Sequence, residues 1–264
     1  MKKKIILLGL LLSLIVFPKS KSMNYSIDKM NYSEGTNIKI SDYLKAKANS
    51  GSITNYNDGN KTEMYTFSHE ATEQTGALTD YRYIGNSPNN YVSFNCDNDG
   101  KNCEIWRIIG VFTVEDENGN KEERVKIVRG SGFKDTMKWD SNKVNDWTTS
   151  SLNTYLNETY LSSLSALSKS MIGNTKYYLR GQLDDDVIST NYGTTDEIYT
   201  WESGNEVYSG RPTNWTGKIS LLYPSDEYYM YALGVDNTCY NSPLSCNSTN
   251  DASPSTGWIY NSNT

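Results

Sequence analysis

The sequence contains a single histidine, His69, among 264 residues. A nucleophile activated by a histidine base, or a metal centre built from several imidazoles, would therefore have only this residue to use. His69 lies where a polar segment meets the predicted folded domain, so we do not expect it to be catalytic. Because no nucleophile–base pair is recognisable elsewhere, the sequence favours a non-enzyme and predicts no catalytic residue.

Long apolar runs are absent outside the N-terminus. Residues 5–17 form an apolar run of 13 residues, with lysine at positions 2–4 before it and Ser20 and Ser22 after it. A membrane span needs roughly 20 apolar residues, and this shorter pattern is typical of a signal peptide cleaved before Met23. We therefore predict a signal peptide over residues 1–22, or an uncleaved anchor, and an extracellular or cell-surface protein. Membrane contact is expected only if this segment is uncleaved.

Basic residues are few in the predicted mature chain. The whole sequence has 25 Lys and Arg against 31 Asp and Glu, but five of the lysines lie within the first 22 residues. The remainder carries 20 basic and 31 acidic residues, a net charge of −11. Proteins that bind nucleic acid or anionic membranes normally present a basic patch. We therefore expect no nucleic-acid partner.

The four cysteines form two pairs with the same spacing. Cys96 and Cys103 bracket one turn-rich loop, and Cys239 and Cys246 bracket another. In an oxidising compartment this pattern predicts two local disulfides. A metal site is disfavoured because neither the C-x2-C spacing nor a neighbouring histidine is present.

Two acidic stretches raise the question of a calcium cofactor. Residues 97–100 (Asp-Asn-Asp-Gly) and 184–186 (three Asp) are rich in oxygen ligands. The first lacks the closing Glu of an EF-hand loop, and a hairpin tip itself favours Asn, Asp and Gly. We expect solvated turns and no cofactor, with Ca²⁺ as the open alternative.

The segment from about residue 90 to residue 130 indicates an antiparallel meander of three strands. Residues 81–85 read as a first strand, followed by β-branched and aromatic segments at 91–95, 105–114 and 124–129. Residues 105–114 are apolar on both faces, which predicts the central, covered strand. Asn118-Gly119 predicts a type I′ hairpin turn, since both central residues of that turn need positive φ.

Helices and polar segments complete an α+β domain over residues 77–264. Ser150 is a predicted N-cap of a short helix that stops near Asn157, and a second helix is predicted over 161–171. Further strands are predicted at 176–179 and 219–223. Residues 23–76 are poor in apolar side chains and read as a low-complexity stalk with one short helix at 41–48.

Five stretches carry a resemblance to a known family: residues 81–85 (YRYIG), 88–92 (PNNYV), 103–112 (CEIWRIIGVF), 147–157 (WTTSSLNTYLN) and 218–226 (KISLLYPSD). Together they resemble an uncharacterised family of exported proteins from Gram-positive, gut-type bacteria. That family is similar in architecture to the C-type-lectin-like fold shared with formylglycine-generating enzymes. The resemblance implies a lectin-like domain with further strands after Trp258, which leaves open that the closing strand is missing. The paired-cysteine chemistry of the formylglycine-generating enzymes is not carried over.

The loop-rich segment 180–231 is the predicted recognition surface, because a lectin-like fold usually places its recognition surface in such loops. Aromatic side chains suit sugar faces and protein hot spots alike, so the expected partner is a glycan or protein on a cell surface. The predicted ligand-binding residues are Trp201, Tyr208, Trp215, Tyr223, Tyr228 and Tyr229. The sequence thus favours a secreted binding or adhesion module. The alternatives are a glycan-directed hydrolase, with carboxylates from Glu202, Glu206 and Asp226, and a structural subunit of a surface appendage.

Overall fold

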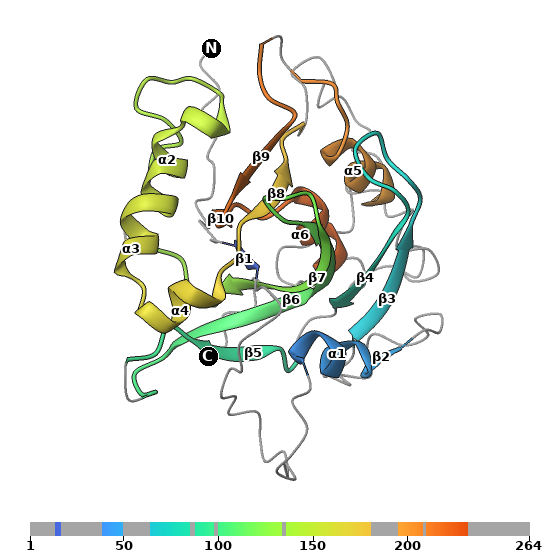
Figure 1. The fold of residues 1–264 in the computed structure, drawn as a ribbon, viewed down its shortest axis with the longest axis vertical. Helices are drawn as coiled ribbons and strands as arrows, with labels where there is room; N and C mark the ends of the chain where they lie inside the picture. The colour runs from blue at the N-terminus through green and yellow to red at the C-terminus, as the bar shows by residue number, and fades with distance from the viewer. Residues whose placement is uncertain are drawn as a thin grey trace.

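The fold is mixed α+β, with one large, mainly antiparallel sheet and several short helices, as the sequence predicts (Figure 1). A computed structural model describes residues 14–16, 39–49, 64–84, 88–97, 100–133, 136–180, 195–207 and 210–231. Within these residues no helix is both long enough and apolar enough to cross a membrane.

The large sheet has the strand order β10-β1-β7-β6-β4-β3-β2, with β5 paired to β6 beside this path. Its pairs are antiparallel except β2 with β3. The strands are β1 (Leu14–Val16), β2 (Ala48–Asn49), β3 (Met64–His69), β4 (Leu78–Tyr83), β5 (Tyr91–Phe94), β6 (Glu104–Glu115), β7 (Lys121–Arg129) and β10 (Ile219–Ser220). A second, two-stranded sheet joins β8 (Thr175–Tyr178) to β9 (Asn214–Gly217).

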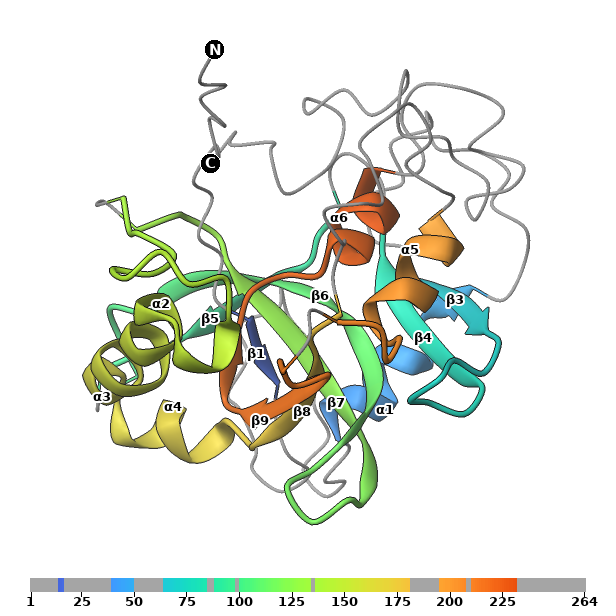
Figure 2. The same cartoon turned by 90° about the horizontal axis from the view of Figure 1, so that it is seen from above.

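The helices gather at two ends of the sheet. A 3-10 turn (Trp147–Thr149) leads into α2 (Ser151–Thr154), a π-helix (Tyr155–Tyr160), α3 (Leu161–Ser163) and α4 (Ala166–Met171). Figure 2 shows α2–α4 at one end of the molecule and α5 (Thr195–Glu202) with α6 (Pro224–Tyr231) at the other. The remaining helix, α1 (Ile40–Lys45), lies near β2.

The meander prediction is confirmed: β5, β6 and β7 pair in sequence order, and β6 is the central, covered strand. Its residues from Trp106 to Phe112 are all buried. Side chains on the two faces of β6 feed different cores, with Trp106 and Ile108 in the larger one and Ile109 and Phe112 in the smaller one. A strand covered on both faces needs apolar side chains on each, and a register shift between Ile108 and Gly110 interrupts the simple alternation here.

The hairpin between β6 and β7 is confirmed, but the predicted type I′ turn is wrong. Five residues separate the last pair, Glu115 and Lys121, and among them only Gly119 has a positive φ (81°). The Asp116 carboxylate accepts the backbone N–H groups of Asn118 (2.7 Å) and Asn120 (2.9 Å). The aspartate side chain, not a pair of left-handed residues, closes this turn.

The predicted stalk over residues 23–76 does not hold for its described parts. The helix predicted at 41–48 is present as α1, but its Leu44 is only 1% exposed within the larger core. β3 pairs along its whole length with β4, and Met64 is fully buried. The prediction that the folded domain begins at residue 77 is therefore wrong: a few well-spaced apolar residues suffice to place polar segments against a large sheet.

The predicted N-cap is confirmed, whereas the predicted stop of that helix is wrong. Ser150 accepts the backbone N–H of Asn153 at 3.1 Å. Asn157 lies inside the π-helix, and its amide binds the backbone of the neighbouring strand: Nδ2 donates to the Ile219 carbonyl (2.8 Å), and Oδ1 accepts from the Ile219 N–H (3.0 Å). The next break comes at Leu164, before Ser165 caps α4.

Candidate functional site

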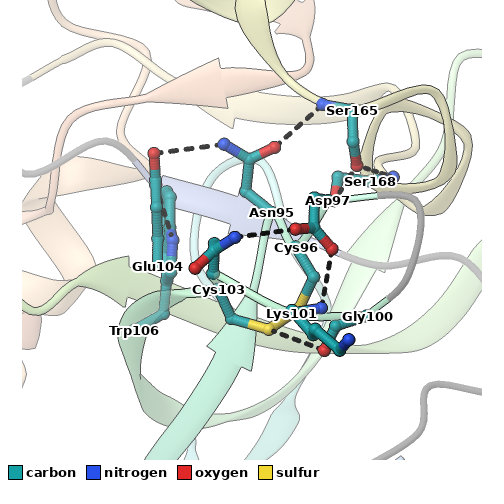
Figure 3. The surroundings of a disulfide bond; sticks show 11 residues. Asn95, Cys96, Asp97, Gly100, Lys101, Cys103, Glu104, Trp106, Ser165 and Ser168 are labelled. Carbon is teal, nitrogen blue, oxygen red and sulfur yellow. Dashed lines mark hydrogen bonds between the residues drawn. A yellow bond between two sulfur atoms is a disulfide. The ribbon is translucent and has the colours of Figure 1, made fainter.

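The disulfide loop at the start of β6 is built as a structural staple (Figure 3). Cys96 and Cys103 are bonded, as predicted, while Cys239 and Cys246 lie outside the described residues. The Asp97 carboxylate, a candidate calcium ligand, instead accepts the Lys101 N–H (2.7 Å) and the Asn102 side chain (2.9 Å). The described residues contain no group of His, Cys, Asp or Glu side chains arranged to hold a metal ion.

The predicted aromatic face is not a single exposed surface. Trp201 on α5 is 39% exposed, as expected of a recognition residue. Trp215 on β9 is partly buried and packs against Trp147 and Tyr177, with both ring centroids 5.7 Å away. Tyr229 on α6 is only 1% exposed, so its prediction as a surface residue is wrong. Tyr208 and the side chain of Tyr228 lie outside the described residues.

Tyr223, another residue of the predicted face, lines a pocket between the two sheets and helices α5 and α6. Its hydroxyl accepts the Tyr178 N–H (2.6 Å) and donates to the Tyr178 carbonyl (3.2 Å), which fixes the Tyr223 ring beside the cavity. The cavity measures about 90 Å³. Its walls are apolar and aromatic, formed by Leu78, Phe112, Val114, Tyr177, Tyr178, Tyr199 and Tyr223.

The floor of this pocket is a network of buried ionisable side chains, which we call the buried charge cluster. Its members are Asp80, Arg82, Lys126, Glu202, Ser225 and Asp226, each no more than 6% exposed. Asp80 and Arg82 come from β4, Lys126 from β7, Glu202 from α5, and Ser225 with Asp226 from α6. Four elements far apart in the sequence therefore contribute side chains to one pocket.

Arg82 and Asp226 form the centre of the buried charge cluster. Arg82 donates from Nη1 to Asp226 (2.9 Å) and from Nη2 to Asp80 (2.7 Å). Lys126 donates its ammonium N–H to the second oxygen of Asp226. Each buried cation thus has a carboxylate partner, as charges taken out of water require.

Aromatic rings hold both cations in place. The Arg82 guanidinium lies 4.5 Å from the Phe112 centroid and 4.2 Å from the Tyr229 centroid. The Lys126 ammonium lies 4.8 Å from both Phe112 and Tyr223. These cation–π contacts add to the ion pairs and restrict the side chains to one geometry. The Arg82 Nε donor nevertheless has no acceptor among the described residues.

Glu202 differs from the two aspartates because its partner is neutral. Ser225 donates its backbone N–H to Oε1 (2.7 Å), and its hydroxyl hydrogen-bonds Oε2 (2.6 Å). Burial raises the pKa of Glu202 to about 8, against the pull of these hydrogen bonds, and nearby Asp226 raises it further. Burial therefore favours the protonated form of Glu202 at neutral pH, with both of its oxygens hydrogen-bonded to Ser225.

The other pKa shifts in the buried charge cluster follow from burial and from the charged groups nearby. Burial opposes ionisation of Asp80, but Arg82 and His69 outweigh it and hold the pKa of Asp80 below its usual value. Burial lowers the pKa of Lys126 despite the attraction of Asp226. Burial lowers the pKa of Arg82, but the neighbouring carboxylates of Asp80 and Asp226 outweigh this cost and hold it above its usual value.

His69 is a support for this cluster and not part of a stalk. It lies in β3, is 3% exposed, and its Nε2 hydrogen-bonds Asp80 at 3.1 Å. The Tyr199 ring stacks on it at 3.8 Å between centroids. The expectation that His69 lies at a polar junction is wrong because β3 joins the sheet and carries it into the interior.

Sequence reasoning identified Glu202 and Asp226 only as two of three scattered carboxylates. The structure brings these two to one pocket, while Glu206 lies apart and pairs with Arg180 at 3.2 Å. Asp80, Arg82 and Lys126 were missed. A signal was available, since Arg82 and Lys126 each interrupt a strand between apolar or aromatic neighbours.

Comparisons with known proteins add nothing to this geometry. No family model, curated protein or solved structure matches the chain. We therefore derive the function from the site itself.

Proposed function

We propose that the chain is an exported, cell-surface binding module with a lectin-like architecture. The leader-like composition of residues 1–22 supports export. An antiparallel sheet that carries short helices and long connections is consistent with the lectin-like family resemblance. The recognition site in this proposal is the tyrosine-walled pocket, in place of the exposed loop face that the sequence predicts.

The main support for the proposal is that the positive and negative charges at the pocket floor cancel. Asp80 and Asp226 compensate Arg82 and Lys126, and Glu202 is largely protonated near pH 7. At the rim, Glu115 and Lys176 pair at 3.2 Å. A pocket whose charges cancel does not select an ion. Its polar groups orient a neutral ligand while its rings supply contact area.

The size of the cavity limits what enters it. About 90 Å³ corresponds to roughly three water molecules at about 30 Å³ each, and a cavity of about 150 Å³ holds one benzene ring. The cavity therefore admits only part of one sugar residue at the end of a chain. The C–H faces of that sugar suit the tyrosine rings, and its hydroxyl oxygens suit the Arg82 Nε donor. We therefore propose a neutral sugar residue of a surface glycan as the ligand.

A glycan-directed hydrolase is the second candidate, and one observation favours it. Glu202 and Asp226 line the same pocket, and the raised pKa of Glu202 suits the acid of the carboxyl pair that glycoside hydrolysis requires. Against it, both oxygens of Asp226 accept hydrogen bonds from buried cations. Hydrogen bonds from two cations stabilise the Asp226 carboxylate, and this makes it a weak nucleophile or base.

Glycan-array binding by the purified protein, followed by calorimetry on the best ligand, tests the proposal. Thr113→Trp places a large ring at the pocket wall and should abolish binding, whereas Lys121→Trp, on the same hairpin but outside the pocket, should not. Retained binding by Thr113→Trp, with loss on Trp201→Ala, would place recognition on the loop face instead.

Product analysis separates the two candidates. A binding module leaves the bound glycan intact, and Glu202→Gln, which keeps the shape of a protonated carboxyl, should change its affinity only a few-fold. Release of shorter sugars by the wild type, abolished in Glu202→Gln, would establish the hydrolase.

A further inference from the structure

The N-terminal apolar segment occupies a position inside the large sheet. β1 lies between β7 and β10, with Leu14 opposite Val128 on one side and Ser220 on the other (Figure 1). Ile15 lies opposite Ile127 and Ile219. Figure 2 also shows β1 within the sheet, close to β7. Both of its edges are therefore paired.

The two neighbours of β1 are among the most buried parts of the molecule. Ile127, Val128 and Ile219 are each at most 1% exposed. Without a strand between them, the facing N–H and C=O groups of β7 and β10 would lose their partners in an apolar setting, which is costly. The opposite edge of β10 is not available for pairing, because the Asn157 side chain already binds the Ile219 backbone there.

We infer that the lane between β7 and β10 is a strand-acceptor site, and that the apolar segment containing Leu14–Val16 of the same chain is the strand it holds. The lane is defined by residues 126–128 of β7 and 219–220 of β10. This inference does not depend on the pocket or its ligand. It concerns the segment that we predict as a signal peptide or anchor: as β1, this segment is retained after export, neither cleaved before Met23 nor held in lipid.

Three fates of this segment exclude one another. Cleavage before Met23 would separate β1 from the domain, and a membrane anchor would hold the same apolar residues in lipid. A strand in the sheet needs the segment attached to, or at least bound by, the folded domain. Occupation of the lane therefore links processing of the N-terminus to the stability of the sheet, since removal of residues 1–22 leaves the lane open to another extended apolar segment.

A proline scan in the full-length chain tests whether Leu14–Val16 is a paired strand. Proline removes a backbone N–H, and at a strand paired on both edges any such loss breaks a ladder hydrogen bond. Ile15→Pro should lower the melting temperature by at least about 5 °C. Lys19→Pro, three residues after the end of β1, is the matched control and should leave the melting temperature unchanged. Equal melting temperatures for the two variants would overturn the inference.

Complementation in trans tests the identity of the occupant. A chain that begins at Met23 should be less stable than the full-length chain, and a fluorescein-labelled synthetic peptide of residues 10–20 should bind it and restore its melting temperature. The same peptide with Ile15→Pro should do neither. A shortened chain that stays monomeric and as stable as the full chain would refute the lane. A shortened chain that forms dimers which the peptide cannot dissociate would show that a second copy is the occupant and would refute the assignment to Leu14–Val16.

Discussion

Arg82 and Asp226 are 144 residues apart in the sequence, yet Arg82 Nη1 donates to Asp226 Oδ1 over 2.9 Å in the interior. This contact joins β4 to α6 and, through Lys126, also to β7. It therefore holds the pocket floor together. Because both carboxylate oxygens are engaged, loss of Asp226 leaves two buried cations short of a partner.

Asp226→Asn should accordingly lower the free energy of unfolding by about 3–5 kcal/mol, the usual cost of breaking a buried ion pair from one side. Chemical denaturation measures it. Glu206→Gln is the control, because the Glu206 side chain is 70% exposed in its pair with Arg180 and its loss should cost less than about 1 kcal/mol. Similar small losses in both variants would mean that the cluster tolerates an unpaired cation.

Glu202 should make folding stability depend on pH in a defined direction. Its pKa rises from 4.5 in the unfolded chain to about 8 in the fold, so the folded state binds the extra proton. This contribution is complete below about pH 4.5 and is lost as pH rises to about 8, at no more than about 1.4 kcal/mol per pH unit.

Glu202→Gln should remove that dependence, because glutamine is neutral throughout. The difference in unfolding free energy between wild type and Glu202→Gln should fall between pH 4.5 and pH 8 and be flat above it. Taking the difference cancels the opposite contribution of Lys126, whose lowered pKa makes folding more favourable as pH rises. Glu70→Gln, the same change at an exposed position, is the matched control.

Replacing both Cys96 and Cys103 with serine should cost about 2–3 kcal/mol of stability on the chain-entropy estimate, because the bridge closes a short loop. The same loss should appear when the wild type is unfolded in the presence of a reductant. Non-reducing peptide mapping should recover the Cys96–Cys103 peptide pair. Recovery of Cys96 joined to Cys239 or Cys246 would contradict the structure.

Trp201 and Trp215 should respond differently to alanine. Trp215 packs between Trp147 and Tyr177, and its ring also covers Gly217, so Trp215→Ala should lower stability by about 3 kcal/mol. Trp201→Ala should leave the melting curve almost unchanged because its side chain is among the exposed ones. Paired melting and glycan-binding measurements on both variants check this. If Trp201→Ala alone abolished binding without loss of stability, the site would be the loop face.

Local patterns were enough to predict the meander, the Ser150 cap and the first disulfide. In each case the information lies within a few neighbouring residues: β-branched runs in β6 and β7, a serine before an apolar helix face, and two cysteines around one loop. Asn118-Gly119 misled because Asp116, two residues earlier, supplies a competing way to close the turn.

The pocket could not be predicted because its residues are brought together by tertiary structure alone. Asp80, Lys126, Glu202 and Asp226 share no spacing, and nothing in their separate neighbourhoods shows that one cavity holds them. The exposure of aromatic residues was likewise undetermined, since Tyr229 and Trp201 occur in equally polar stretches but point to the interior and to solvent respectively.

Asn157 protects one edge of the large sheet from pairing with another molecule. One side-chain amide occupies both the donor and the acceptor of Ile219 on the outer side of β10, so that strand offers no free ladder there to a neighbouring molecule. An amide that mimics one residue of a strand ends the sheet without adding a strand. It blocks one route by which a protein with an exposed sheet edge would polymerise.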